Sequence, residues 1–220
     1  MSQIKTKIYL LKFIIVPIAF FVVGTVILMF ALLPIFKPYI EVAKLFVFSE
    51  DYVSRTSQNT VDVSCLSDND YINIDNIDLP AQGDRYATIN IDSIELETSV
   101  YYGDSVKELN KGVGTYLGCY LPGQGRTILM CAHNNSYFKD LNNISEGDHI
   151  NISTNYGKYI YTVTGFKVAD KSDKSAYDLT RKSDNLILYT CYPFDTLGLT
   201  RMRYFVYADY TSGPRINYQS

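Results

Sequence analysis

The chain of 220 residues is long enough for one globular domain and an additional segment. Hydrophobic residues make up 47% and charged residues 20%, a composition that excludes a disordered chain, and the formal net charge of −3 gives no basis for nucleic-acid binding. The four cysteines form no Cys-x-x-Cys pair and there are two histidines, so we expect no metal site and no cofactor.

The first element in chain order is an apolar segment. The 24 residues from Phe13 to Phe36 carry no charged side chain and are long enough to cross the hydrocarbon core of a bilayer. Lys5, Lys7 and Lys12 precede them, which favours a cytoplasmic N-terminus. A cleaved signal peptide is the alternative, although the run exceeds the usual length of a signal h-region. We predict a cytoplasmic tail and one transmembrane helix over residues 1–36, which places the remaining chain outside the cytoplasm.

The next segment, residues 37–80, is predicted to be an extracytoplasmic linker. Asp and Asn recur between Val61 and Pro80, where no Lys or Arg occurs, and these residue types favour turns over strands. The pattern changes at about residue 81. We therefore predict a β-rich domain over residues 81–212 and a C-terminal tail over residues 213–220.

Within this domain, short β-rich runs alternate with clusters of Gly, Pro, Asn and Asp, a pattern typical of an all-β barrel or sandwich. One short helix is predicted near Ser105–Lys111. The strands are predicted at Tyr86–Ile91, Leu96–Tyr101, Thr127–Ala132, His149–Ser153, Tyr159–Val168, Asn185–Thr190 and Arg203–Tyr210.

Three residues whose side chains can take part in catalysis lie where predicted strands meet loops. His133 ends one apolar run, Cys191 ends another, and Arg203 begins a third. Strand ends are common positions for catalytic groups, because a rigid element holds the side chain at the surface. A Cys thiolate, a His that transfers protons and an Arg that stabilises an oxyanion together suit acyl transfer. The plain alternatives are a buried core thiol, a loop histidine and a solvated arginine, and Arg201 shares the strand face of Arg203.

At these residues the sequence resembles the sortases, the cysteine transpeptidases of bacterial cell surfaces. The resemblance spans roughly residues 83–210 and implies a closed eight-stranded β-barrel with short helices. Two departures are Ile187, where the family signature Thr-Leu-x-Thr-Cys begins with Thr, and Ala132, where many sortases have Gly. The resemblance is carried, in order, by Tyr101–Ser105 with Gly112–Gly114, Leu121–Gly125 followed by Thr127–His133, Leu188–Cys191, and Arg203–Val206.

The resemblance also implies a role for each site residue. Cys191 is the expected nucleophile, His133 the general acid and base, and Arg203 the group that stabilises the oxyanion or the substrate. Thr190 and the loop Ala169–Asp184 are the expected substrate-binding elements; this loop has no acidic cluster on which to base a calcium requirement. The implied enzyme is anchored in the cell membrane. It cleaves a Leu-Pro-x-Thr-Gly-like signal of a secreted protein and transfers the protein to an amine of a peptidoglycan precursor.

Subclass and alternative functions rest on further features. The loop between Val168 and Asn185 is too short for the extra helix of class B, and residues 37–85 hold no Asp-Pro-aromatic lid of class C. A class D-like enzyme fits best, with class A next. The alternatives are another extracytoplasmic cysteine peptidase, an L,D-transpeptidase, or a non-catalytic membrane-anchored β-module. A disulfide among Cys65, Cys119 and Cys131 is left open.

Overall fold

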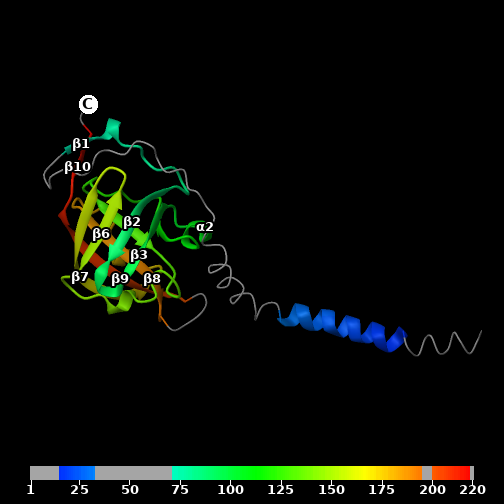
Figure 1. The fold of residues 1–220 in the computed structure, drawn as a ribbon. Coiled ribbons are helices and arrows are strands. Elements are labelled where there is room, and N and C mark those ends of the chain that lie inside the picture. The colour runs from blue at the N-terminus through cyan, green and yellow to red at the C-terminus, as the bar shows by residue number, and fades with distance from the viewer. Residues whose placement is uncertain (1–14, 33–70, 195–199, 219–220) are drawn as a thin grey trace, which may run out of the picture. The chain divides into compact units, whose positions relative to one another are not determined.

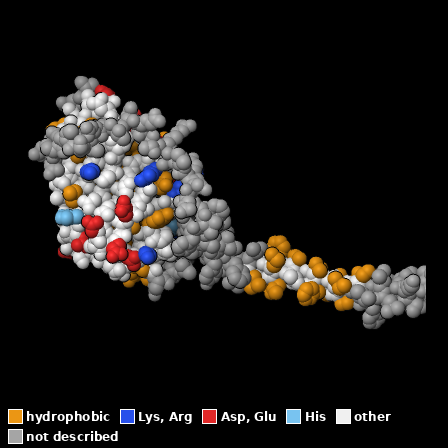
Figure 2. Space-filling view, viewed as in Figure 1, with side chains coloured by type: hydrophobic (Ala, Val, Ile, Leu, Met, Phe, Trp, Pro, Cys, Tyr) orange, Lys and Arg blue, Asp and Glu red, His pale blue; other side chains and the backbone are white. Residues whose placement is uncertain are grey.

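The structure is a computed structural model that describes residues 15–32, 71–194 and 200–218, in two units that are treated separately. The first unit contains one helix, Ile15–Leu32, whose length and composition suit a membrane span and would equally suit a secretion signal. Its apolar side chains are exposed around the helix, as the orange atoms in Figure 2 show. The predicted cytoplasmic tail, most of the predicted linker and Cys65 lie outside the described residues.

The second unit is a closed barrel of eight strands in the order β2-β3-β4-β5-β8-β9-β7-β6 (Figure 1). The all-β fold predicted from the sequence is therefore confirmed. The pairs β3–β4 and β5–β8 are parallel, and the other six are antiparallel. The strands are β2 Arg85–Ile91, β3 Leu96–Tyr102, β4 Val113–Thr115, β5 Thr127–Cys131, β6 His149–Thr154, β7 Lys158–Asp170, β8 Asn185–Tyr192 and β9 Met202–Ser212.

Short helical elements occupy the connections between these strands. The predicted helix near residues 105–111 is present as α2, Val106–Leu109, capped at its N-terminus by the Ser105 side chain. All seven predicted strands are present, and β4 is the barrel strand that the prediction missed. In the described part of the chain, three 3-10 turns lie between barrel strands, at Asp92–Ile94, Leu141–Asn143 and Lys174–Ala176, and a fourth, Ile74–Asn76, precedes β2.

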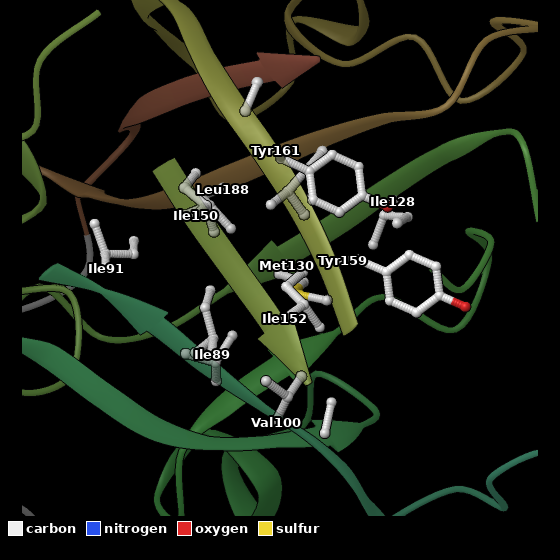
Figure 3. Close-up of a cluster of buried hydrophobic side chains, with 14 of the residues drawn as sticks. Ile89, Ile91, Val100, Ile128, Met130, Ile150, Ile152, Tyr159, Tyr161 and Leu188 are labelled. Carbon is white, nitrogen blue, oxygen red and sulfur yellow. The ribbon is translucent and has the colours of Figure 1, made fainter. Parts of the chain in front are cut away.

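The interior of the barrel is filled by alternate side chains of its strands, as expected where successive residues point to opposite faces. Figure 3 shows these side chains meeting between the strands. Burial of each large aliphatic side chain contributes about 1.5–3 kcal/mol, so this cluster accounts for much of the stability of the barrel. The labelled members are Ile89, Ile91, Val100, Ile128, Met130, Ile150, Ile152, Tyr159, Tyr161 and Leu188, all at most 1% exposed.

A second, smaller apolar cluster covers the outer face of β5, β8 and β9. Leu129, Ile187 and Phe205 point outward from these strands and are still buried, because Ala176 and Tyr177 of the β7–β8 loop pack on them. The strands β5 and β8 are thus covered on both faces. Burial on both faces explains why their sequences are continuous apolar runs rather than alternating ones.

Two short strands pair outside the barrel. β1, Tyr71–Asn73, runs parallel to β10, Arg215–Asn217, and Figure 1 shows the pair at one end of the barrel. β1 falls within the predicted linker and β10 within the predicted tail. Asp184 connects this region to the barrel, since its buried carboxylate accepts hydrogen bonds from Tyr161 Oη at 3.0 Å and Arg215 Nη1 at 3.4 Å.

Candidate active site

Cys191 and Arg203 face each other across neighbouring strands. The antiparallel register of β8 and β9 pairs these two residues directly. Arg203 Nη1 donates hydrogen bonds to the carbonyl oxygens of Thr200 at 2.8 Å and Met202 at 2.9 Å. Arg201, the alternative from the sequence, precedes β9, has a side chain that is 81% exposed, and forms an ion pair with Asp170. The register therefore places Arg203, and not Arg201, opposite the thiol.

His133 reaches the same place from β5. The parallel register of β5 and β8 pairs Cys131, the last residue of β5, with Tyr189; His133 follows Cys131 by two residues in the loop, and Cys191 follows Tyr189 by two residues in β8. The Thr190 hydroxyl donates a hydrogen bond of 2.7 Å to the carbonyl oxygen of Ala132, which maintains this alignment past the last paired residues. The register thus places the three residues that the sequence singled out at the adjoining ends of β5, β8 and β9.

Cys191 and Arg203 also share a face of the barrel wall. Cys191 and Arg203 have the same strand parity as the outward-pointing Ile187 and Phe205, so their side chains project outside the barrel. Thr190 has the opposite parity and is 1% exposed. Thr190, expected among the substrate-binding residues, therefore lies beneath the outer surface and holds the end of β5 against β8.

A pocket of about 240 Å³ opens on this face next to Arg203. Side chains of β5, β8 and β9 form its floor; the β3 and β4 ends form one wall, and the β7–β8 loop forms the other. On β8 the floor is formed by Tyr189, which lies between Ile187, the register partner of Leu129, and Cys191, the register partner of Arg203. The lining residues are Asp104, Tyr116, Leu129, Lys171, Tyr177, Tyr189, Arg203 and Phe205.

Comparisons with known proteins identify the family of this chain. A family model described as a sortase domain matches residues 89–211, which is more than half of the chain. The chain belongs to the sortase family. Sortase D of Bacillus subtilis (strain 168) is 31% identical over 128 residues, which are 58% of this chain and 65% of that relative. The chain thus matches slightly less than two thirds of the length of this curated relative.

Solved structures of other sortases share the fold. Sortase C from Clostridium perfringens SM101 is 29% identical and covers 60% of this chain and 72% of its own, with a TM-score of 0.54. A Clostridium perfringens sortase C solved with the C-terminal cell wall sorting motif is 28% identical, covering 60% and 73%, with a TM-score of 0.55. Sortase A from Corynebacterium diphtheriae is 25% identical, covering 60% and 63%, with a TM-score of 0.54.

Membership in this family decides several expectations. The match to a sortase domain, the domain of a cysteine transpeptidase, excludes the three alternatives from the sequence, namely another cysteine peptidase, an L,D-transpeptidase and a non-catalytic β-module. The relatives include sortases of classes A, C and D, so they show the family without separating its classes. Among the described residues, no group of three His, Cys, Asp or Glu side chains is placed to hold a metal ion.

Burial sets the ionisation of the groups around the sortase site. Burial lowers the pKa of His133, so its imidazole is neutral near neutral pH and can accept a proton. Burial also raises the pKa of Cys119 to about 11 and that of Cys131 to about 12. These two thiols and Cys191 form no disulfide, and Cys191 alone of the three combines partial exposure with a place beside His133 and Arg203.

Several residues of the pocket were missed by sequence reasoning. Lys171 and Tyr177 are not among the missed residues, because they fall in the loop Ala169–Asp184 that we expected to bind substrate. Tyr189 and Phe205 have the strand parity of Cys191 and Arg203, a signal that could have identified them. Asp104, Tyr116 and Leu129 carried no such signal, since their places depend on how β3, β4 and β5 are ordered in the barrel.

Proposed function

We propose that this chain is a membrane-anchored sortase that cleaves a Leu-Pro-x-Thr-Gly-like sorting signal and joins the protein to an amine of a peptidoglycan precursor. The observation that carries this proposal is the register that brings His133, Cys191 and Arg203 to one edge of the barrel, beside a groove. A nucleophile, a proton carrier and a fixed cation at one edge provide the parts that acyl transfer through a thioester needs.

In the first half of the reaction, His133 accepts the proton of the Cys191 thiol. The Cys191 Sγ atom attacks the Thr carbonyl carbon of the signal, and the guanidinium of Arg203 stabilises the oxyanion that forms. The carbon–nitrogen bond to Gly then breaks. The protonated His133 donates its proton to the departing Gly amine, and the protein remains bound to Cys191 as a thioester.

In the second half, the amine of a peptidoglycan precursor attacks the thioester carbonyl. His133 accepts a proton from this amine, and the Cys191 thiolate leaves as the new amide bond forms. Arg203 stabilises the second oxyanion in the same way as the first. The protonated His133 then returns its proton to the Cys191 thiolate. The enzyme is back in its starting state, and the overall reaction exchanges one amide for another.

The groove suits the apolar part of the proposed signal. Tyr189 and Phe205 on its floor, with Tyr177 on its wall, present apolar surface to the Leu and Pro side chains. The similar Clostridium perfringens sortase C solved with a cell wall sorting motif supports a substrate of this kind.

The apolar helix supports the proposed location. In our proposal it spans the cell membrane once, with the N-terminus in the cytoplasm and the barrel outside. This arrangement holds the enzyme where secreted proteins emerge and where lipid-linked peptidoglycan precursors reside. Its substrates are then the secreted proteins that carry the signal, and its second partner is the precursor amine.

The test uses the full chain in detergent micelles, a fluorogenic Leu-Pro-x-Thr-Gly peptide library and a glycine peptide as the acceptor amine. We expect cleavage between Thr and Gly, a ligated product in the mass spectrum, and no reaction by the Cys191→Ala variant. Cys119→Ala is the matched control, because it removes a different thiol. Cleavage that survives Cys191→Ala would remove Cys191 from the mechanism. A folded wild-type chain that cleaves no peptide would overturn the proposal.

A further inference from the structure

We propose that Asn134 is a positioning residue that holds His133 in line with Cys191; this inference rests on the proposed function. The main-chain pairing of β5 with β8 ends at Cys131 and Tyr189. Both His133 and Cys191 lie beyond that last pair. Their alignment therefore depends on contacts other than the regular hydrogen bonds of the sheet.

Two side-chain hydrogen bonds cross between the strands on either side of the catalytic pair. Before the pair, the Thr190 hydroxyl donates to the carbonyl oxygen of Ala132 at 2.7 Å. After the pair, Asn134 Nδ2 donates to the carbonyl oxygen of Pro193 at 3.0 Å. His133 follows Ala132 and precedes Asn134, and Cys191 lies between Thr190 and Pro193. The two bonds thus bracket the imidazole and the thiol.

The bracketing bonds differ in their surroundings. The bond from Thr190 is buried inside the barrel wall, whereas the bond from Asn134 is exposed and joins two loops. The loop after His133 also has a firm anchor of its own, because Phe138 N donates to the His133 carbonyl at 3.0 Å and the Phe138 side chain is completely buried. Loss of the Asn134 bond should therefore leave the fold intact and release only the link between the two catalytic loops.

The chemistry makes this link important. Proton transfer between a thiol and an imidazole requires a short, aligned contact, and a misplacement of about 1 Å can lower a rate by about 100-fold. Asn134 touches neither reacting atom in this scheme. It acts through the backbone at Pro193, two residues after Cys191, and through its own chain connection to His133. It should therefore affect the chemical step more than substrate binding.

The test compares Asn134→Ala and Asn134→Leu with Asn135→Ala in the full chain in detergent micelles. Leu keeps the branched shape of the Asn side chain without a donor, and Asn135 is an exposed neighbour in the same loop. We expect both Asn134 variants to lower kcat by about 10-fold to 100-fold, with KM changed by less than about 2-fold. The thermal midpoint should stay close to that of the wild type, and Asn135→Ala should behave as the wild type.

A second measurement needs no substrate. The rate of iodoacetamide alkylation of Cys191, followed by peptide mass mapping, should fall in both Asn134 variants, because the imidazole no longer assists formation of the thiolate. An unchanged kcat, a loss confined to KM, or an equal effect of Asn135→Ala would overturn the inference. If the wild-type chain cleaves no peptide, the proposed function fails, and an unchanged alkylation rate would then overturn the role of Asn134 as well.

Discussion

The clearest quantitative prediction concerns the Thr190 hydroxyl. Thr190 is 1% exposed, and its hydroxyl donates to the carbonyl oxygen of Ala132 at 2.7 Å. Thr190→Val keeps the branched shape of the side chain and removes this donor. A buried carbonyl that loses its partner costs about 1–3 kcal/mol, and we take about 2 kcal/mol for this position. For a domain of this size, that loss lowers the thermal midpoint by about 4–8 °C.

Thr190→Ser is the matched control, because it keeps the hydroxyl and removes one methyl group. Its expected cost is about 1 kcal/mol for the lost apolar contact. The assay is thermal unfolding of the full chain in detergent micelles at one scan rate, together with kcat for the signal peptide. Thr190→Val should be the less stable and the slower of the two. If Thr190→Ser proves more destabilising than Thr190→Val, the methyl group matters more than the hydrogen bond, and the reasoning is refuted.

Three further predictions test other parts of the structure. Arg203→Lys should lower kcat by about 100-fold, because the planar donor group of the guanidinium is lost. Arg201→Lys should keep kcat within about 2-fold of the wild type. Equal effects of the two substitutions on kcat would contradict the assignment of Arg203 from the strand register. Lys171→Glu reverses the charge of a groove side chain, so it should shift the preference at the variable signal position toward basic residues by about 3-fold or more, as measured by peptide-library kinetics. Lys174→Glu, outside the groove, should cause no such shift. Burial raises the pKa of Asp184 to about 6, so the folded state holds that proton more tightly than the unfolded state. Relative to that of Asp184→Asn, the unfolding free energy of the wild type should therefore fall by up to about 3 kcal/mol as the pH rises from about 4 to 6. Urea unfolding at each pH measures both free energies, and an equal pH dependence of the two would contradict this prediction.

The sequence predicted those strands whose pattern is local. The runs that end at Ala132 and Thr190 are apolar throughout, because their strands are covered by the barrel interior on one face and by the β7–β8 loop on the other. Such runs stop abruptly at solvent, which is why His133 and Cys191 could be recognised at their ends. The choice of Arg203 over Arg201 followed from the same reasoning, since the apolar run begins directly after Arg203.

The missed elements depend on contacts between distant segments. β4 has three residues, one of which is Gly114, so it is too short to show an alternating pattern. β1 lies among Asp and Asn residues that favour turns, and its pairing with β10 becomes favourable only once the two chain segments meet. The groove residues Asp104 and Tyr116 were missed for the same reason. Their place beside β5 follows from barrel closure, which no local pattern contains.

The arrangement of the barrel explains how one structure can be both stable and reactive. The inner faces of β5, β8 and β9 carry Met130, Leu188 and Val206, which are completely buried, and this packing fixes the three strands relative to one another. The outer faces of the same strands end in the catalytic residues that we propose. This packing therefore fixes the register of the three strands as far as their last paired residues. Beyond that point the side-chain hydrogen bonds of Thr190 and Asn134 hold the two chain segments together. The Thr190 bond is buried and the Asn134 bond is exposed, so we expect Thr190→Val to lower both stability and kcat and the Asn134 variants to lower kcat alone.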